Sequence, residues 1–461
     1  MSDQNSPQNP PSQAGKDGLL RKAGRAFLDG FAPLKVRNIH IYLSGQAVSL
    51  LGTWMQITAQ SWVVWTLSKS PFVLGLVPML GSLPLLVLGP WTGVLADRLD
   101  RRRVLIATQT IAMLGAFAMA LLVQTHLIRL WHVYILALVL GVVSALDFPS
   151  QQAFIGDLAG VSQIRKAVVL NAMIFQLSRM LGPALAGWVV GALGAAPAFW
   201  LNGVSFLAVI GTLLAIHGNQ ERTATTGNSS LEDFREGLGF IAGQPRIQDL
   251  LGFAILVTVF GISAAQLLPA FATDVFGKGA AGLGTLMGAS GAGALISSIF
   301  IVPIAQRIRR TGLVLTAAIA WTGLTWVAFS TIHAFAPAVV AIFLGSLTLP
   351  VVMTTTNGMI QFLAPPNMRA RVVGAYLMLS FGMQPISSLF VGLTGKYLGP
   401  PTAVLINGTL MVLGGVALIV FRPGLRSWAP YHLPTEAGGG QGQKPGEPER
   451  GPQPALDPTE S

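Results

Sequence analysis

Two charged side chains stand well away from the ends of long apolar stretches of this sequence. Asp147 lies in an apolar run over residues 131–155, and Arg179 lies in a run over residues 167–192. A charge at membrane depth is costly, so it usually serves a function and has a partner. We expect Asp147 to take part in function, and by helix position Arg179 is one partner for it. The alternative is that Asp147 lies in the headgroup layer, since it is only about two turns from the end of its run.

Uncharged polar side chains recur along the first apolar run at a spacing of three and four residues. This spacing places them on one face of a helix: they are Gln46, Ser49, Thr53, Gln56 and Gln60. In lipid these groups would lack hydrogen-bond partners, so the face lines either a cavity or a helix contact. We favour the cavity. Polar side chains of later runs are expected to face it, namely Gln266, Thr355, Asn357, Gln361 and Gln384.

The patterns of several catalytic classes are missing. The chain has no cysteine, which excludes disulfides, thiol catalysis and cysteine-ligated metals. Its 6 histidines are scattered without metal-ligand spacing, and no His, Asp and Glu constellation suits a membrane-embedded enzyme. No Gly-x4-Gly-Lys-Ser/Thr segment occurs, so ATP is not the expected energy source. We predict no enzyme activity, no metal and no cofactor.

The elements that position these residues follow from composition. Apolar residues make up 52% of the 461-residue chain and charged residues only 10%, against about 25% in a soluble domain. A run of about 20 apolar residues crosses a bilayer as a helix. The sequence contains twelve such runs, at 38–66, 72–96, 103–124, 131–155, 167–192, 195–216, 248–275, 281–306, 312–332, 335–363, 371–396 and 401–422.

Most basic residues lie on one side of these predicted spans. The net charge of +11 comes from Lys and Arg in short loops and tails on the side that carries both termini. Lys69, Arg129, Lys278 and Lys396 stand on the other side. The positive-inside rule therefore predicts a multi-pass protein of the cytoplasmic membrane with both termini in the cytoplasm. It also explains the charge without a nucleic-acid partner.

The longest internal polar stretch divides the chain into six runs plus six. We predict an all-α membrane protein of two pseudo-symmetric six-helix bundles over residues 38–216 and 248–422, joined by a cytoplasmic loop over 217–247. Residues 1–37 form a cytoplasmic tail, in which residues 16–31 are either a surface-lying helix or disordered. Residues 423–461 are rich in Gly and Pro and are expected to be a disordered cytoplasmic tail.

The two predicted bundles repeat each other in sequence. Residues 193–203 align without a gap with residues 398–408, at an offset of 205 residues, and both segments join the last two runs of their half. Gly75-Leu76 recurs as Gly282-Leu283, and a basic cluster follows the second run of each half. Parallel repeats of this kind are typical of transporters whose substrate site lies between the halves.

The segment Gly93-Val-Leu-Ala-Asp-Arg-Leu-Asp-Arg-Arg-Arg stands at the cytoplasmic end of the second run. It resembles the G-x-L-a-D-r-x-G-r-r signature of the major facilitator superfamily, except that Asp100 replaces the second glycine, which puts the tight turn there in doubt. A topological basic loop would explain the arginines but not the Gly and Asp. The resemblance implies a gate motif of Gly93, Asp97, Arg98, Arg101 and Arg102. In it, Asp97 caps the helix over 371–396, and Arg101 belongs to a charge network that closes the cytoplasmic side. Arg101 thus becomes a second candidate partner for Asp147.

A third motif follows Arg179 in the fifth run. Gly182, Pro183 and Gly187 resemble the G-P-x-x-x-G end of the antiporter motif of exporters in this superfamily. Ordinary close helix packing explains the same small residues equally well. The preceding glycines of the full motif are absent, which weakens the inference of export.

The order of these motifs resembles the branch with bacterial multidrug efflux pumps and enterobactin-type siderophore exporters. The resemblance implies a monomeric secondary transporter that exports a small amphipathic molecule by alternating access, as a proton antiporter driven by the proton gradient. Asp147 is the candidate proton carrier by elimination, and Arg179 would suit an anion. The alternatives are an importer of the same fold and a membrane protein that transports nothing.

Overall fold

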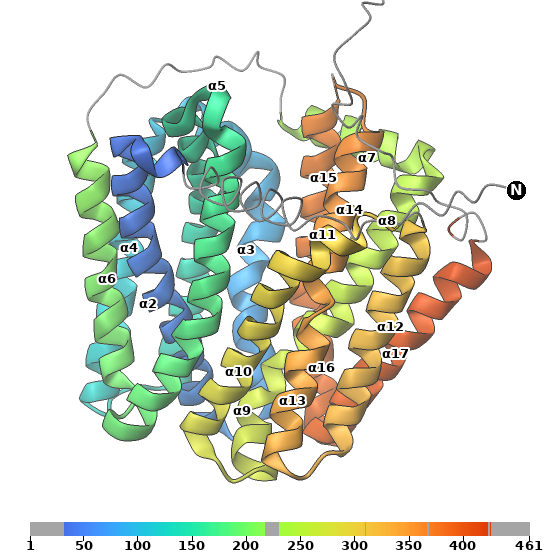
Figure 1. Cartoon of the computed structure of the whole chain (residues 1–461). Coiled ribbons are helices and arrows are strands. Elements are labelled where there is room, and N and C mark those ends of the chain that lie inside the picture. Colours follow the sequence, from blue (N-terminus) through green and yellow to red (C-terminus); the bar gives the residue numbers. More distant parts are fainter. Residues whose placement is uncertain (1–31, 217–229, 309, 367, 423–424, 426–461) are drawn as a thin grey trace, which may run out of the picture.

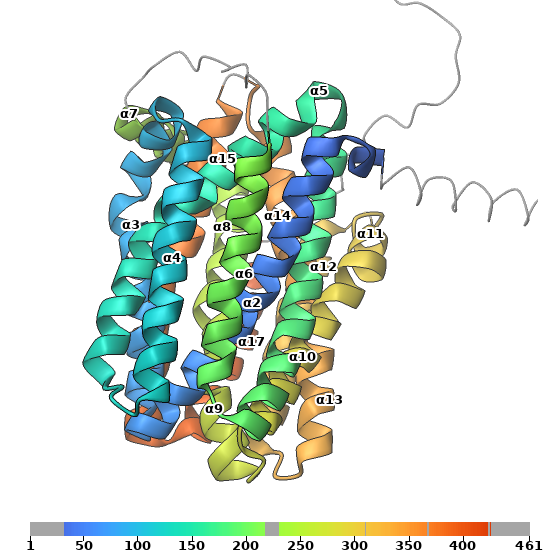
Figure 2. The same ribbon diagram turned by 90° about the vertical axis from the view of Figure 1, so that its left-hand side faces the viewer.

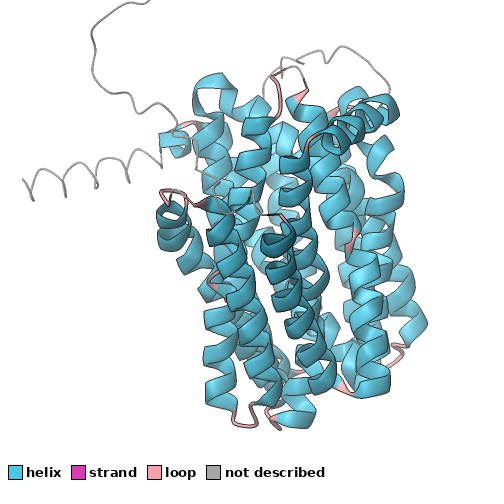
Figure 3. Ribbon diagram, turned by 90° about the vertical axis from the view of Figure 1, so that its right-hand side faces the viewer, coloured by secondary structure: helices cyan, strands magenta, loops and turns pink. Residues whose placement is uncertain are grey.

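The computed structural model describes residues 32–216, 230–308, 310–366, 368–422 and 425. Every regular element in these ranges is helical, as Figure 3 shows. Predictions for the two tails therefore fall largely outside the described residues. The first half of the chain contains η1 (Ala32–Lys35), α2 (Arg37–Ser68), α3 (Pro71–Arg98), α4 (Arg101–Gln124), α5 (Leu130–Leu193) and α6 (Ala196–Ala215).

The second half contains more and shorter elements, because several membrane-length helices include wider or tighter turns. Its elements are α7 (Ser230–Gly243), α8 (Pro245–Leu256), η2 (Val257–Ile262), η3 (Ala265–Leu267), α9 (Leu268–Ala270), η4 (Phe271–Val275), α10 (Gly279–Ile296), η5 (Ser297–Ile301), α11 (Val302–Ala305), α12 (Thr311–Thr331), α13 (Phe335–Ser346), α14 (Leu349–Leu363), α15 (Arg369–Gly382), α16 (Gln384–Leu398) and α17 (Pro400–Phe421). The stretch 217–247, expected to be a loop, thus contains the helix α7.

Eleven helical segments of the described chain are long and apolar enough to cross a membrane. They match eleven of the predicted runs. The remaining run corresponds to α2, which is 32 residues long but carries the polar face predicted from sequence, and these side chains lower its hydropathy. Two of the eleven spans, Leu130–Ala159 and Lys166–Leu193, belong to the single helix α5. The chain turns back between them while staying helical (Figures 1 and 2).

The helices define two faces of the molecule. The terminal face carries the start of α2 and α4 and the turn of α5, at the top of Figure 1. Arg101, Arg307 and Arg371 stand at helix ends on this face. The opposite face carries α9 and the start of α13, and Lys69 and Lys278 lie there. Between the faces, large apolar side chains such as Trp188 and Leu413 are exposed on the outer surface, as expected for contact with lipid.

The buried apolar side chains form three cores that differ between the two faces. One core near the opposite face draws on both halves and includes Trp65, Phe199, Phe271 and Phe329. Near the terminal face each half has a core of its own, around Phe154 in the first half and around Tyr376 in the second. The halves therefore pack into one interior near the opposite face and into two interiors near the terminal face.

Glycine pairs bring helices of the two halves into close contact. A Cβ atom added at Gly187 of α5 would lie 2.7 Å from the Cα of Gly284 in α10. A Cβ atom added at Gly75 of α3 would lie 2.9 Å from the Cα of Gly392 in α16. Gly187 and Gly392 are separated by the 205-residue offset of the repeat. Gly75 and Gly284 are 209 residues apart, so the two crossings lie at similar but not identical positions of the repeat, and both require the absence of a side chain.

We expect Gly187→Ala to destabilise the protein by about 1–3 kcal/mol, because the added methyl group overpacks the crossing. Gly191→Ala is the matched control, since a Cβ atom there meets only Ala281 Cβ, at an ordinary 3.8 Å. The measurement is the melting temperature of each purified variant in detergent. Equal melting temperatures for the two variants would show that the crossing is not tightly packed.

Candidate functional site between the two halves

A cavity of about 370 Å³ lies between the halves. Its lining comes from α2, α3 and the first span of α5 on one side, and from η3, α9 and α10 on the other. Most of the lining is apolar, and its polar groups include Gln60, Ser144 and Gln266. Gln266 donates a hydrogen bond to Ser388 Oγ over 2.8 Å, while its own carbonyl oxygen is buried without a partner.

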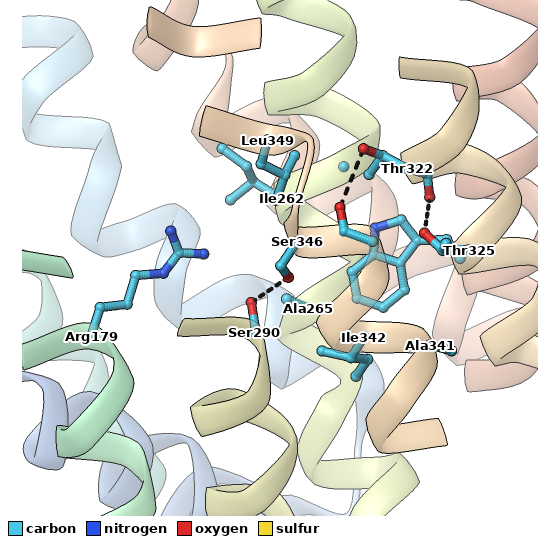
Figure 4. A pocket seen from close by; sticks show the side chains of 13 residues that line it. Arg179, Ile262, Ala265, Ser290, Thr322, Thr325, Ala341, Ile342, Ser346 and Leu349 are labelled. Carbon is cyan, nitrogen blue, oxygen red and sulfur yellow. Dashed lines mark hydrogen bonds between the residues drawn. The ribbon is translucent and has the colours of Figure 1, made fainter. Parts of the chain in front are cut away.

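A second, smaller cavity of about 50 Å³ lies within the second half and adjoins the first at Ala265, which lines both. Its polar lining includes Ser290 of α10, Ser346 of α13 and Thr322 of α12. The lining also includes Arg179, which reaches in from α5 of the first half. Figure 4 shows its guanidinium directed toward the hydrogen-bonded pair of Ser290 and Ser346.

The polar face of α2 divides between helix contacts and the cavity. Gln46 donates to Gln151 of α5 over 3.1 Å, and Gln56 accepts from Asn202 of α6 over 2.7 Å. Both are buried, at 3% and 6% exposure, so they join helices of the first half. Ser49 is also buried, and Thr53 donates to a carbonyl of its own helix. Gln60 alone of the five lines a cavity described above.

The polar residues expected in the later runs occupy different surroundings. Gln266 shares the larger cavity with Gln60, across the boundary between the halves. Thr355 is buried in α14 with a hydroxyl that has no partner, while Gln361 donates to Asn357 one turn earlier. Gln384 is half-buried at the start of α16. Neither cavity is lined by these last four residues.

Asp147 accepts hydrogen bonds from three side chains of the first half. They are Thr108 at 2.6 Å, Gln109 at 3.0 Å and Gln151 at 2.6 Å. Among the described residues, neither Arg101 nor Arg179 forms an ion pair with it. Gln151 also accepts from Gln46, so the network extends to α2. Asp147 lies one turn beyond Ser144, which lines the larger cavity.

Two arginines of the predicted gate motif have partners within the first half. Arg101 pairs with Asp157 over 2.7 Å, and their side chains are only 18% and 11% exposed. Arg102 donates to the carbonyls of Leu213 and Leu214 at the end of α6. The side chains of Gly93, Asp97 and Arg98 lie outside the described set, and so does the predicted cap on α15.

Asp100, the departure from the family pattern, has a structural explanation. It precedes α4, and its side chain accepts a hydrogen bond from the backbone N–H of Arg103 over 3.2 Å. This is a helix N-cap, a position at which Asp is preferred. Its φ of −69° is open to any residue. The turn therefore needs no glycine here.

Three acidic residues with charged partners escaped the sequence analysis. Asp157 pairs with Arg101, Asp249 of α8 pairs with Arg422 over 3.4 Å, and Glu236 of α7 pairs with Arg371 of α15. All three lie near span ends on the terminal face, where the basic clusters were noted. The presence of acidic residues near the basic clusters of that face could have indicated such ion pairs. The sequence alone does not show which acidic residue pairs with which arginine, because the partners are far apart in the chain.

The antiporter-like motif lies at the crossing of three helices. A Cβ atom at Gly182 would lie 2.5 Å from Trp54 Cβ in α2, and Gly187 meets Gly284 of α10. The carbonyl of Pro183 faces the same Gly284. Arg179 precedes this crossing by one turn, and its guanidinium lies 5.9 Å from the ring centroid of Trp54.

An all-helical membrane fold with a cavity between its two halves is typical of membrane transporters. The fold matches that of a POT family transporter crystallised with a thioalcohol-conjugated peptide, at a TM-score of 0.68 and 11% identity over 84% of this chain and 96% of the other. The family model for transmembrane secretion effectors of the major facilitator superfamily matches residues 28–434. The chain belongs to this family.

Relatives with similar sequences match this chain over most of its length. The multidrug efflux pump Tap of Mycolicibacterium fortuitum is 26% identical over 81% of this chain and 93% of its own. An uncharacterised MFS-type transporter of Bacillus subtilis, YfiS, is 26% identical over 82% and 91%. The enterobactin exporter EntS of Shigella flexneri is 24% identical over 88% and 94%. The resemblance to efflux pumps and siderophore exporters is thus confirmed.

We expect a double-mutant cycle on Arg101→Gln and Asp157→Asn to give a coupling energy of about 1 kcal/mol or more, because the pair is largely shielded from water. Arg103 and Asp100 provide the control, at 3.7 Å with side chains 88% and 46% exposed. Their coupling is expected near zero. Unfolding of the purified variants provides both values. Equal coupling in the two pairs would contradict the structural importance of Arg101 with Asp157.

Proposed function

We propose that this chain is a secondary active exporter that moves small amphipathic molecules across the cytoplasmic membrane by alternating access. In this proposal α2 is a twelfth span, and the spans form two six-helix bundles over residues 38–216 and 248–422. The observation that carries the proposal is the cavity between the two halves, which adjoins a smaller cavity in the second half. The halves share a core near one face only. Export is favoured because Tap and EntS are named as exporters.

The packing supports an inward-facing state. With the terminal face in the cytoplasm, the shared core and the two glycine crossings close the external side. Near the terminal face the halves share no buried core and are in contact there through α3 with α7 and α15, so less packing must be broken for them to part on that side. Rocking about the crossings would exchange which side is closed, as in repeat-based transporters.

Proton coupling is assigned to Asp147 in this proposal. Its carboxylate lies at membrane depth, accepts three side-chain hydrogen bonds and stands one turn from the larger cavity. Protonation would remove the charge that holds these donors and would loosen the link to α2 through Gln151 and Gln46. Since α2 also lines the cavity, a proton at Asp147 can alter the substrate site.

The orientation is open to a direct test because the natural chain has no cysteine. In intact cells, a membrane-impermeant maleimide should label Lys278→Cys but should label Arg307→Cys only after permeabilisation. The reason is that the two residues lie on opposite faces. The reverse labelling pattern would place the terminal face outside and would contradict the proposed topology.

We expect cells that express the chain to accumulate less of a fluorescent lipophilic dye than cells without it. Asp147→Asn should restore accumulation to the level seen with a proton uncoupler, because an amide cannot carry the proton. Asp274→Asn is the matched control, since Asp274 is an exposed carboxylate near the opposite face. Export that persists in Asp147→Asn would rule out this carboxylate as the proton carrier, and higher accumulation on expression would indicate import.

A further inference from the structure

Arg179 is a cation without an acidic partner in the part of the chain that the structure describes. It forms no ion pair and donates no hydrogen bond there, and its one charge-related contact is with the Trp54 ring at 5.9 Å. A buried charge without a partner is costly. Two carboxylates of the same half have other partners. Asp147 accepts hydrogen bonds from three side chains, and Asp157 forms an ion pair with Arg101.

The position of Arg179 excludes lipid headgroups as its partner. It stands midway along the span Lys166–Leu193, about 20 Å from either end at the rise of an α-helix. The side chain is half-buried and turns toward the second half rather than toward lipid (Figure 4). An anion that reaches it must therefore enter between the halves.

The surroundings of Arg179 provide further hydrogen-bond donors. Ser290 and Ser346 line the same small cavity and are hydrogen-bonded to each other over 2.9 Å. Both hydroxyls can rotate to donate to an incoming acid group. A planar guanidinium binds a carboxylate through two parallel hydrogen bonds, which makes arginine a preferred residue for such groups.

The adjoining cavity indicates what else the ligand contains. It holds about 370 Å³, its lining is largely apolar, and it meets the small cavity at Ala265. An acid group at Arg179 would therefore leave room for an apolar or aromatic body beside Gln60 and Met287. The combined shape suits an amphipathic anion rather than a small hydrophilic one.

We propose that Arg179 is the anion-binding residue of the transport site and that this site selects amphipathic molecules with a carboxylate or a similar acid group. The inference rests on the proposed function and names the substrate class of the same site. Trp54 helps to position Arg179 through a cation–π contact, with the guanidinium 5.9 Å from the ring centroid. The bound acid group supplies the negative charge for Arg179, with which no carboxylate of the described residues forms an ion pair.

The test uses three ligands with one aromatic body and different charge: 2-naphthoate, 2-naphthamide and 2-naphthylmethylammonium. Their binding to the purified full-length protein in lipid nanodiscs is measured by equilibrium dialysis. The wild type should bind the naphthoate most tightly. Arg179→Gln should weaken naphthoate binding by about tenfold or more, which matches the loss of hydrogen bonds to a charged group. Arg179→Lys should retain part of the preference for the anion, and amide binding should be unchanged.

Arg307→Gln is the control, because Arg307 is an exposed arginine outside both cavities. Absence of naphthoate binding to the wild type would overturn the proposal. Equal losses for anion and amide in Arg179→Gln would also overturn it, since they indicate a structural role. Dye export in cells tests the proposed function separately. Export without charge selectivity would refute the anion site alone, and naphthoate selectivity without export would refute the exporter alone.

Discussion

The hydrocarbon core of a membrane offers no hydrogen bonds, and the arrangement of polar groups in this protein follows from that constraint. Gln46 and Gln56 find partners on neighbouring helices, and Asp147 is enclosed by donors of its own half. Arg179, Gln60 and Gln266 instead reach the boundary between the halves. Polar groups that the helices satisfy themselves give each half rigidity. The polar groups without such partners lie at the boundary between the halves, where a polar ligand could form hydrogen bonds with them. The constraint that stabilises each half thus also places the polar groups of the proposed substrate site.

Close glycine contacts allow such a boundary to be both tight and reversible. In lipid there is little hydrophobic force between helices, so association depends on van der Waals contact at short range. The crossings at Gly187 with Gly284 and at Gly75 with Gly392 bring backbones together without interlocking side chains. Smooth surfaces can roll or separate without rotamer changes. The two crossings lie at similar positions of the repeat, so a rocking motion can act on both in a similar way.

Sequence periodicity predicted this architecture well because lipid imposes long apolar helices on the chain. Eleven of the twelve predicted runs correspond to helices long and apolar enough to cross a membrane. The remaining one, α2, is long enough but less apolar, because of the polar face that the sequence revealed. The direction of that face was predictable, but its partners were not. Gln46 forms a hydrogen bond with Gln151 instead of lining a cavity, and the two residues are 105 positions apart in the sequence. The pairing of Arg101 with Asp157 and the helix α7 were missed for the same reason.

The helix α2 joins the features that a coupled transporter must connect. Its Gln46 contacts the network of Asp147, its Trp54 lies against Arg179, and its Gln60 lines the larger cavity. Among the described residues, the carboxylate of Asp147 and the guanidinium of Arg179 form no ion pair with each other. A direct pair would neutralise both groups and leave neither for a proton or an anion. Under the proposed function, separate sites along α2 leave Asp147 able to take a proton and Arg179 able to bind an anion, with α2 as the element that connects them.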